Sequence, residues 1–294
     1  MTDSPAVRLT RGEEGLRGLP GLIARRSNEI SLAGPDETFM RLSGPFWNLL
    51  LDRYFRLESS GWERLPAAPT LVISVHAGAT LTMDAWRFVI EGWRHFGPQR
   101  VLHGTSHDVL LALPGLGDLF RHGGVIPASA RGIGAALAAG HDVVLWPGGE
   151  RDSMRTWTRR DKVELAGRKG FVRQAIRSGV PIVPVATVGG SDTAPVLFDG
   201  HWIAKKLGGQ KLLRAEMLPV VVGPPFGIAL EALPMHIPLP AKIRFELLDL
   251  IEVDHDPDRT GDKVYVQQIY DLVESRLQSG VDRLARQRRF PLFG

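Results

Sequence analysis

Apolar and polar positions follow one another along this chain in two different patterns. Short runs of apolar, often β-branched residues indicate buried strands, and longer segments with apolar residues three or four positions apart indicate amphipathic helices. The runs predict strands at residues 71–76, 99–103, 141–146, 180–188, 220–222 and 241–250, and the longer segments predict helices at residues 81–96, 129–139, 170–178 and 262–288. Because strands alternate with helices, the sequence predicts a single α/β domain whose mostly parallel or mixed sheet is flanked by helices.

An amphipathic helical element precedes this domain. Residues 37–66 carry apolar and aromatic side chains, such as Phe39 and Trp47, with arginines at their edges. This composition suits a helix that docks in a membrane interface, and it suits equally a helix that packs on the protein's own core. The Gly44-Pro45 pair is expected to break or kink the helix.

The remaining parts of the chain differ in composition. Residues 1–36 are rich in glycine, proline and charge and are expected to form a loosely ordered lead-in, with a short helix near residues 22–28. The first residues carry acids and lack an apolar stretch, so they do not resemble a signal peptide. No run of about 18 apolar residues predicts a membrane span. Residues 67–281 hold the α/β domain, and residues 282–294 form a basic tail with four arginines and one aspartate.

The absence of cysteine excludes disulfides, cysteine zinc sites and a thiol nucleophile. The net charge of +4 suits an anionic partner such as a phosphate-bearing substrate, coenzyme A or an acidic membrane surface. The excess is too small to indicate binding to nucleic acid.

A histidine follows the first predicted strand of the domain. His76 ends the run at residues 71–76, and Gly78 and a helix that contains Asp84 come next. Open α/β sheets bind their ligands at the carboxyl ends of the strands. His76 is therefore a candidate general base, and Asp84 is a candidate to orient its imidazole. The alternative is a histidine that only caps a strand, followed by an ordinary carboxylate in the first turn of a helix.

A glycine-rich turn, Pro-Gly-Gly-Glu-Arg at residues 147–151, follows a second predicted strand. Gly148 and Gly149 allow backbone N–H groups to approach a ligand closely. Glu150 can accept hydrogen bonds from hydroxyl groups, and Arg151 can pair with a phosphate. A base at one strand end that faces an anion-binding turn at another suits the activation of a hydroxyl on a phosphate-bearing molecule.

A basic loop extends from this turn. Residues 151–169 hold seven lysines and arginines against three acidic residues. The loop with Lys169 either meets the phosphates of a ligand or forms a solvated charged face. Elsewhere, His103 and His107 have a spacing that can place two metal ligands on one helix face, but no third ligand is evident and no metal site is predicted.

Taken in order over about residues 68–280, these blocks resemble the glycerolipid (PlsC-like lysophospholipid) acyltransferase superfamily. His76 and Asp84 stand where the family has a His-x4-Asp motif, and residues 146–151 stand where it has a Pro-Glu-Gly-Thr-Arg-like block. The strand Val-Pro-Ile-Val-Pro-Val at residues 180–185 is also similar to the family's. The Pro-Gly-Gly form, the basic loop and the Arg-Lys-Gly-Phe segment at residues 168–171 resemble the branch that contains the type 2 diacylglycerol acyltransferases.

The spacing of the first motif departs from the family's. Seven residues separate His76 from Asp84 instead of four, and the family's position falls on Leu81. Along a continuous helix, eight steps cover about 12 Å. The segment therefore has to loop, with Gly78 as the pivot, for Asp84 to reach the imidazole. The Pro-Gly-Gly-Glu-Arg turn also lacks the family's usual threonine.

The resemblance implies an enzyme that moves a fatty acyl chain from acyl-CoA to a hydroxyl of a lysophospholipid or acylglycerol. The implied site consists of His76 and Asp84 as catalytic groups and of Gly78, Gly148, Gly149, Glu150, Arg151 and Lys169 as groups that bind the substrates. Acyl-CoA is then a co-substrate, and no further cofactor or metal is implied. The implied partners are a glycerolipid acceptor and a membrane surface, with the protein in the cytoplasm and peripheral on the inner face of the cell membrane.

Two other classes of function fit parts of the sequence. A non-catalytic lipid-binding protein on the same fold is the main alternative, since the altered spacing between His76 and Asp84 is compatible with a loss of catalysis. An esterase of the α/β-hydrolase class requires a Gly-x-Ser-x-Gly elbow, which the sequence lacks.

Overall fold

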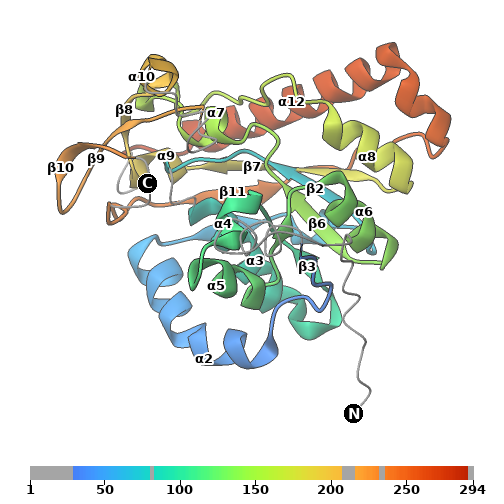
Figure 1. Ribbon diagram of the computed structural model, residues 1–294, viewed down its shortest axis with the longest axis horizontal. Coiled ribbons are helices and arrows are strands. Elements are labelled where there is room, and N and C mark those ends of the chain that lie inside the picture. The colour runs from blue at the N-terminus through green and yellow to red at the C-terminus, as the bar shows by residue number, and fades with distance from the viewer. Residues whose placement is uncertain (1–28, 80–82, 207–215, 232–235, 291–294) are drawn as a thin grey trace, which may run out of the picture.

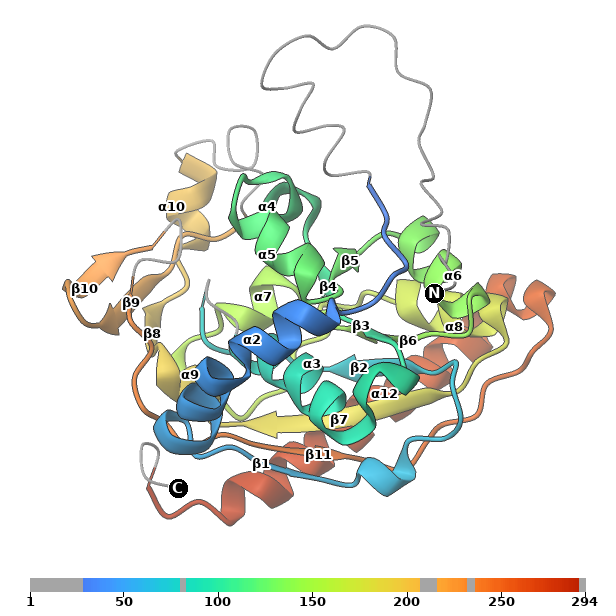
Figure 2. The same cartoon turned by 90° about the horizontal axis from the view of Figure 1, so that it is seen from below.

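A six-stranded mixed sheet forms the centre of the protein. The computed structural model describes residues 29–79, 83–206, 216–231 and 236–290 (Figures 1 and 2). The strands follow the order β1 (Glu58–Ser60), β11 (Arg244–Leu247), β7 (Ile182–Val188), β2 (Leu71–Ser74), β6 (Asp142–Leu145) and β3 (Leu102–His103). Strands β3, β6, β2 and β7 are parallel, β11 is antiparallel to β7, and β1 is parallel to β11. The predicted α/β fold with a mostly parallel or mixed sheet is thus confirmed.

The first three residues of the central strand β2 are apolar, and all four of its residues are buried. It lies between β6 and β7, where Val72 is in register with Val144 of β6 and Val183 of β7. Leu71 and Ile73 pack into one core cluster, and Val72 packs into the cluster on the opposite face of the sheet. A strand that is buried on both faces lacks the apolar–polar alternation of a half-exposed strand.

Helices cover both faces of the sheet (Figure 1). One layer contains α6 (Ala130–Ala138), α8 (Gly170–Ser178) and α12 (Lys263–Arg286), and the other contains α2 (Glu37–Asn48), α3 (Met83–Phe96), α4 (Asp108–Ala112) and α5 (Leu116–His122). Ser129 caps α6 by accepting a hydrogen bond from the N–H of Gly132 (3.1 Å), and Asp262 caps α12 in the same way. The helices predicted at residues 129–139, 170–178 and 262–288 are therefore confirmed. The predicted helix near residues 22–28 lies outside the described residues.

Helix α2 packs on the protein's own core. Met40 and Trp47 are buried against side chains of α3, and Leu51 continues this contact from the π-helix η1 (Leu49–Tyr54). The prediction of a break or kink at Gly44-Pro45 is wrong with respect to a break, since α2 runs through both residues. A proline inside a helix removes one N–H donor, and the packing of the buried face on both sides of it holds the helix together.

A second, three-stranded sheet extends beyond the carboxyl end of β7. It consists of β8 (Val196–Phe198), β9 (Val220–Gly223) and β10 (Gly227–Leu230), in the order β10-β9-β8, and α10 (His201–Lys206) follows β8. We call residues 196–206, 216–231 and 236–240 the distal lobe. Figures 1 and 2 show it at one end of the molecule, next to the short helices that follow β6 and β7. Only β9 corresponds to a predicted strand.

A buried histidine, His103, pairs with the half-buried His141 at the edge of the central sheet. His103 in β3 is fully buried, with Nδ1 2.8 Å from the carbonyl oxygen of Gly124 and Nε2 3.1 Å from Nδ1 of His141. Burial lowers the pKa of His103 from 6.5 to about 4. The cause is desolvation, which disfavours the imidazolium and outweighs the hydrogen bond to Gly124.

This shift predicts a loss of stability in acid. Because the unfolded chain binds a proton at His103 at higher pH than the folded protein does, the stabilisation is complete above a pH of about 6.5 and is lost as the pH falls towards about 4. The free energy of unfolding should fall by about 2 kcal/mol from this group between about pH 7 and about pH 5. Urea unfolding of the wild type and of His103→Gln at both pH values measures the effect. The variant should show the smaller fall, whereas substitution of the exposed His255 by glutamine should leave the fall unchanged; equal falls in the wild type and in His103→Gln would contradict the assignment.

Candidate active site

Three parallel strands end together at the edge of the sheet that faces the distal lobe. Residues 75–79 follow β2, residues 146–149 follow β6 and lead into α7 (Glu150–Ser153), and Gly189 follows β7 and leads into α9 (Gly190–Thr193). The turns are in close contact. A Cβ atom at Gly190 would lie 2.7 Å from the Cβ of Ala77, so only glycine fits where the end of β7 meets the turn that carries His76.

His76 lies flat against a tryptophan from the neighbouring strand end. Its imidazole stacks on the ring of Trp146, with 4.7 Å between the ring centroids and an angle of 6° between the planes. Trp146 is buried in the core cluster that includes Val72 and Val144, whereas His76 is half-buried. Because Trp146 is held in the core, it fixes the plane of the His76 imidazole, and His76 stays partly exposed.

A buried ion pair holds the backbone of His76 from both sides. The N–H of His76 donates to the carboxylate of Asp152, and its carbonyl oxygen accepts a hydrogen bond of 2.7 Å from Nη1 of Arg155. The same guanidinium pairs with the Asp152 carboxylate and also donates to the carbonyl oxygen of Arg160. Asp152 is fully buried, and the Arg155 side chain is 4% exposed. We call these two residues the Asp152–Arg155 clamp.

Neither residue of the clamp was identified from the sequence. Both lie in the basic loop, where charged residues usually face solvent. The pattern of apolar residues gives no information about which charges of a loop are buried. The one signal in the sequence is the position of Asp152 and Arg155 directly after the Pro-Gly-Gly turn.

The glycines of the turn are required by packing. A Cβ at Gly148 would lie 2.0 Å from the carbonyl oxygen of Glu164, and Gly149 has φ +57° and ψ −136°, a conformation open only to glycine. The Gly149 N–H donates to the carbonyl of Trp146 (3.2 Å). Gly78, the predicted pivot, has φ +99° and turns the chain directly after His76. Roles for N–H groups near Gly78 or Gly148 in binding an oxyanion stay a prediction.

Glu150 and Arg151 both contact the distal lobe. Oε2 of Glu150 accepts a hydrogen bond of 2.6 Å from the N–H of Glu216, and Nε of Arg151 lies 3.4 Å from the carboxylate of the same residue. Burial raises the pKa of the Glu150 carboxyl, although backbone N–H groups of Glu216 and Met217 act against this shift. Arg151 is half exposed and lies at the rim of the site. Its predicted pairing with a phosphate, and that of Glu150 with a hydroxyl, stay predictions.

The positions of two predicted site residues, Asp84 and Lys169, are defined by their helices and not by contacts of their side chains. Asp84 lies in the first turn of α3, but its side chain is outside the described part of the structure, so the distance from its carboxylate to His76 stays a prediction. Lys169 is the N-cap residue of α8. Its neighbour Arg168 donates from Nη1 to the carbonyl oxygens of Pro147 (3.1 Å) and Gly148 (3.3 Å), so the segment that carries Lys169 lies against the turn.

Several cations of the basic loop bind the protein itself. Arg160 stacks on the ring of Trp157 (4.3 Å to the ring centroid), and the Trp157 indole donates to the buried carboxylate of Asp192 (2.7 Å). Arg288 from the chain after α12 lies 2.7 Å from the same carboxylate. Asp192, at the end of β7, therefore ties the basic loop and the C-terminal segment to the third strand end. The alternative of a solvated charged face is therefore wrong for Arg155, Arg160 and Arg168, because all three side chains contact other parts of the protein.

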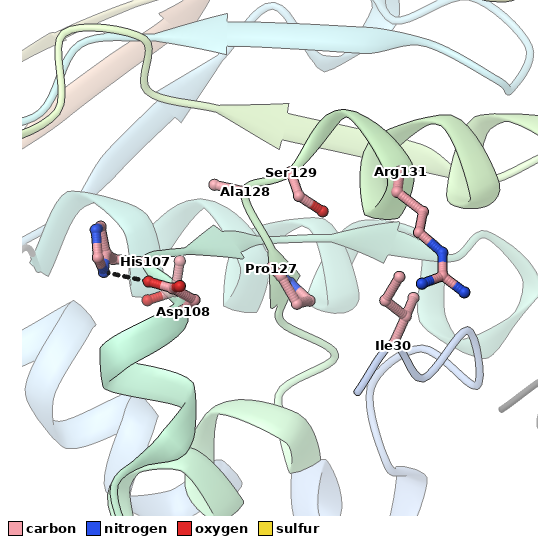
Figure 3. A pocket seen from close by; sticks show the side chains of 8 residues that line it. Ile30, His107, Asp108, Pro127, Ala128, Ser129 and Arg131 are labelled. Carbon is pink, nitrogen blue, oxygen red and sulfur yellow. Dashed lines mark ion pairs between the residues drawn. The ribbon is translucent and has the colours of Figure 1, made fainter. Parts of the chain in front are cut away.

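A cavity of about 300 Å³ lies between α4 and the start of α6 (Figure 3). It lies at the ends of two short parallel strands, β4 (Thr105–Ser106) and β5 (Ile126–Pro127). Figure 3 shows His107 paired with Asp108 on one side (2.8 Å) and Arg131 on the other. In the described part of the chain, no three metal-ligating side chains come together.

Comparison with known proteins shows which family the segment with this site resembles. Residues 68–200, which include His76, the Pro-Gly-Gly turn and the Asp152–Arg155 clamp, match the family model described as diacylglycerol acyltransferase. An uncharacterised protein of Mycobacterium leprae is 28% identical over 252 residues, which cover 85% of this chain and 66% of that protein. Diacylglycerol O-acyltransferase 2 of Homo sapiens is 30% identical over 102 residues, or 32% of this chain and 26% of that protein.

Among solved structures, the 1-acyl-sn-glycerophosphate acyltransferase of Thermotoga maritima aligns with a TM-score of 0.47 and 17% identity, over 90% of this chain and 88% of that one. The chain spans just under two thirds of the length of the mycobacterial relative. The family model matches the part of the fold that carries the histidine and the glycine turn. Over residues 68–200 the chain is similar to the diacylglycerol acyltransferase family.

Proposed function

We propose that this protein transfers a fatty acyl chain from acyl-CoA to a hydroxyl group of a lysophospholipid or acylglycerol. The observation that carries the proposal is the setting of His76. Its ring stacks on Trp146 and its backbone is held on both sides by the Asp152–Arg155 clamp. A half-buried imidazole in a fixed position, inside the segment that matches the acyltransferase family model, suits a general base.

The proposed chemistry is a direct transfer. His76 takes the proton of the acceptor hydroxyl, and the oxygen attacks the thioester carbonyl carbon. A C–O bond forms, the C–S bond breaks, and the proton passes from the imidazolium to the leaving thiolate of coenzyme A. Asp84 orients the imidazole in this scheme, and N–H groups near Gly78 or Gly148 stabilise the oxyanion. The absence of cysteine agrees with a transfer that has no thioester on the enzyme.

The substrates are proposed to bind at the rim of the three strand ends. Arg151 is half exposed beside the turn and carries a charge suited to a phosphate of the acceptor. Glu150 is suited to a hydroxyl, and Lys169 to the phosphates of coenzyme A or a lipid headgroup. Acceptors of this class reside in membranes, so we also propose peripheral association with the cytoplasmic face of the cell membrane. Among the described residues, none of the helices has the length and apolar character needed to cross a bilayer.

A non-catalytic lipid-binding protein on the same fold is the second candidate. The observation that favours it is the spacing of the first motif, with seven residues between His76 and Asp84 where the family has four. Such a protein would bind acyl-CoA or glycerolipid without releasing a thiol.

Thiol release from palmitoyl-CoA tests the proposal. Purified protein is supplied in turn with lysophosphatidic acid, another lysophospholipid, monoacylglycerol and diacylglycerol, and the release of coenzyme A is followed with a thiol reagent. We expect release that depends on one of these acceptors, which also identifies the acceptor. If thiol release fails with every acceptor while the protein still binds the same lipids, the lipid-binding candidate is correct and the proposal is wrong.

A further inference from the structure

The distal lobe exposes an unusual amount of apolar surface. Of the fourteen large apolar side chains that are exposed in the described part of the chain, seven belong to residues 197–237. Trp202, Phe226, Ile228 and Ile237 are each more than half exposed. Single exposed apolar residues are common on protein surfaces, but a cluster of this kind marks a surface that contacts something else.

The tip of the lobe carries no charge. Residues 219–230, which form β9, β10 and the turn between them, contain no Asp, Glu, Lys or Arg. Strand β10 is the outer strand of its sheet, and three of its four residues are exposed. Proteins usually protect such an outer strand with charged residues or prolines, because bare strand edges pair with other chains. The uncharged, apolar edge of β10 is therefore a candidate contact surface.

The charges around the tip favour an anionic lipid surface as the occupant. Lys205 and Lys206 end α10, and both are exposed. Trp202 on the same helix is 57% exposed, and tryptophan is the side chain most typical of the membrane–water interface. Apolar side chains flanked by lysines combine insertion between lipids with attraction to anionic headgroups.

The lobe is joined directly to the candidate active site. Glu150 and Arg151, at the end of the Pro-Gly-Gly turn, both contact Glu216 in the segment that leads into β9. On its other side, the lobe accepts a hydrogen bond from the Tyr54 hydroxyl to the carbonyl oxygen of Pro238 (2.6 Å). Figure 2 shows the three strands of the lobe beyond the end of β7, on the side where β2, which His76 follows, also ends. A membrane bound to the distal lobe would therefore lie next to the candidate active site.

We infer that the distal lobe is the membrane-docking surface of this protein, and that it inserts the β9–β10 tip into the headgroup region of an anionic bilayer. The inference rests on the proposed function and specifies where the lipid acceptor enters. It differs from the expectation that residues 37–66 dock on the membrane, which stays a prediction. Met40 and Trp47 of α2 pack on the core, whereas Leu42 and Phe46 on the same helix are 73% and 57% exposed.

Three substitutions with matched exposure test the inference. Ile228 in β10, Leu49 in η1 and Val264 in α12 are 66%, 65% and 68% exposed, and each is replaced by serine. Binding is measured by sedimentation with vesicles of equal parts phosphatidylcholine and phosphatidylserine. Ile228→Ser should weaken binding about tenfold, since an isoleucine side chain leaves the bilayer. Leu49→Ser should have a smaller effect, and Val264→Ser should have none.

Charge reversal provides an independent variant that leaves the apolar tip intact. Lys205→Glu combined with Lys206→Glu should weaken binding to vesicles with phosphatidylserine about tenfold or more and should change binding to pure phosphatidylcholine little. The inference is overturned if Ile228→Ser and the charge-reversed variant bind like the wild type, or if Leu49→Ser alone abolishes binding. It is overturned as well if the lobe proves to pair two copies of the chain, that is, if the wild type is a dimer without lipid and Ile228→Ser is a monomer.

Acyl transfer measured in two forms separates this inference from the proposed function. With donor and acceptor chains short enough to stay dissolved, Ile228→Ser should release thiol at the wild-type rate, and with the acceptor in vesicles its rate should fall with its binding. If no transfer occurs in either form, the proposed function is wrong, and sedimentation alone still decides whether the lobe docks.

Discussion

Replacing His76 by alanine should lower kcat for acyl transfer by a factor of about 100 to 10,000, the usual contribution of a general base. The substitution removes the nitrogen that accepts the hydroxyl proton but leaves the backbone contacts to Asp152 and Arg155. His76→Gln is the companion variant, because an amide group can still pack on Trp146 without acting as a base. Acceptor-dependent thiol release measures both, and KM should change little in either.

Another stacked histidine provides the control. The His95 ring lies on Trp62, with 5.4 Å between the centroids and 16° between the planes, at the end of α3. His95→Ala therefore removes the same side chain from a similar contact and should keep the wild-type kcat. Activity that survives in His76→Ala would show that another group takes the proton, and equal losses in both variants would point to a change in folding.

Replacing Arg155 by methionine should lower the free energy of unfolding by about 3–5 kcal/mol. The substitution keeps the length of the side chain but leaves the fully buried carboxylate of Asp152 without its cation, and such a charge is costly in the interior. The variant also deprives the carbonyl oxygen of His76 of its donor. Urea unfolding measures the stability, and thiol release by the folded fraction should show a lower kcat with little change in KM.

Two comparisons isolate the clamp. Arg159→Met breaks an ion pair with Glu164 in the same loop, but Arg159 is 61% exposed, so the loss should stay below about 1 kcal/mol. The double variant Asp152→Asn/Arg155→Met removes both buried charges and should lose less stability than the two single variants together. If Arg155→Met unfolds like Arg159→Met, the pair does not hold the loop. If it loses stability but keeps its kcat, the clamp stabilises the fold without positioning His76.

The apolar pattern of the sequence predicted the centre of the fold well. Strands β2, β6 and β7 are mostly apolar and buried on both faces, with one polar residue each, and α8 has the bounds that its helical spacing indicated. These elements can be recognised from the sequence because their residues are buried, and buried positions are mostly occupied by apolar residues. Their parallel order then brought the predicted His76 and the predicted glycine turn to one edge, as the rule for strand ends requires.

The parts that the sequence did not reveal depend on contacts between distant residues. Asp152 and Arg155 look like any charged pair in a basic loop, and only the folded chain shows that they enclose the backbone of His76. Strands β8 and β10 are short, and their pairing with β9 is what makes them strands. The expected break at Gly44-Pro45 failed because packing of α2 on α3 outweighs a local preference.

The close fit of the strand ends has a consequence for how this protein can evolve. Gly148 faces a backbone carbonyl and Gly190 faces Ala77, so neither position can gain a side chain without moving the turn that carries His76. If the proposed function is correct, a lineage that acquires a new acceptor has to change Arg151 and the distal lobe, while Gly148 and Gly190 stay as they are. In the proposed function, the residues around His76 would then be inherited together, and the specificity for a lipid acceptor would change through surface residues.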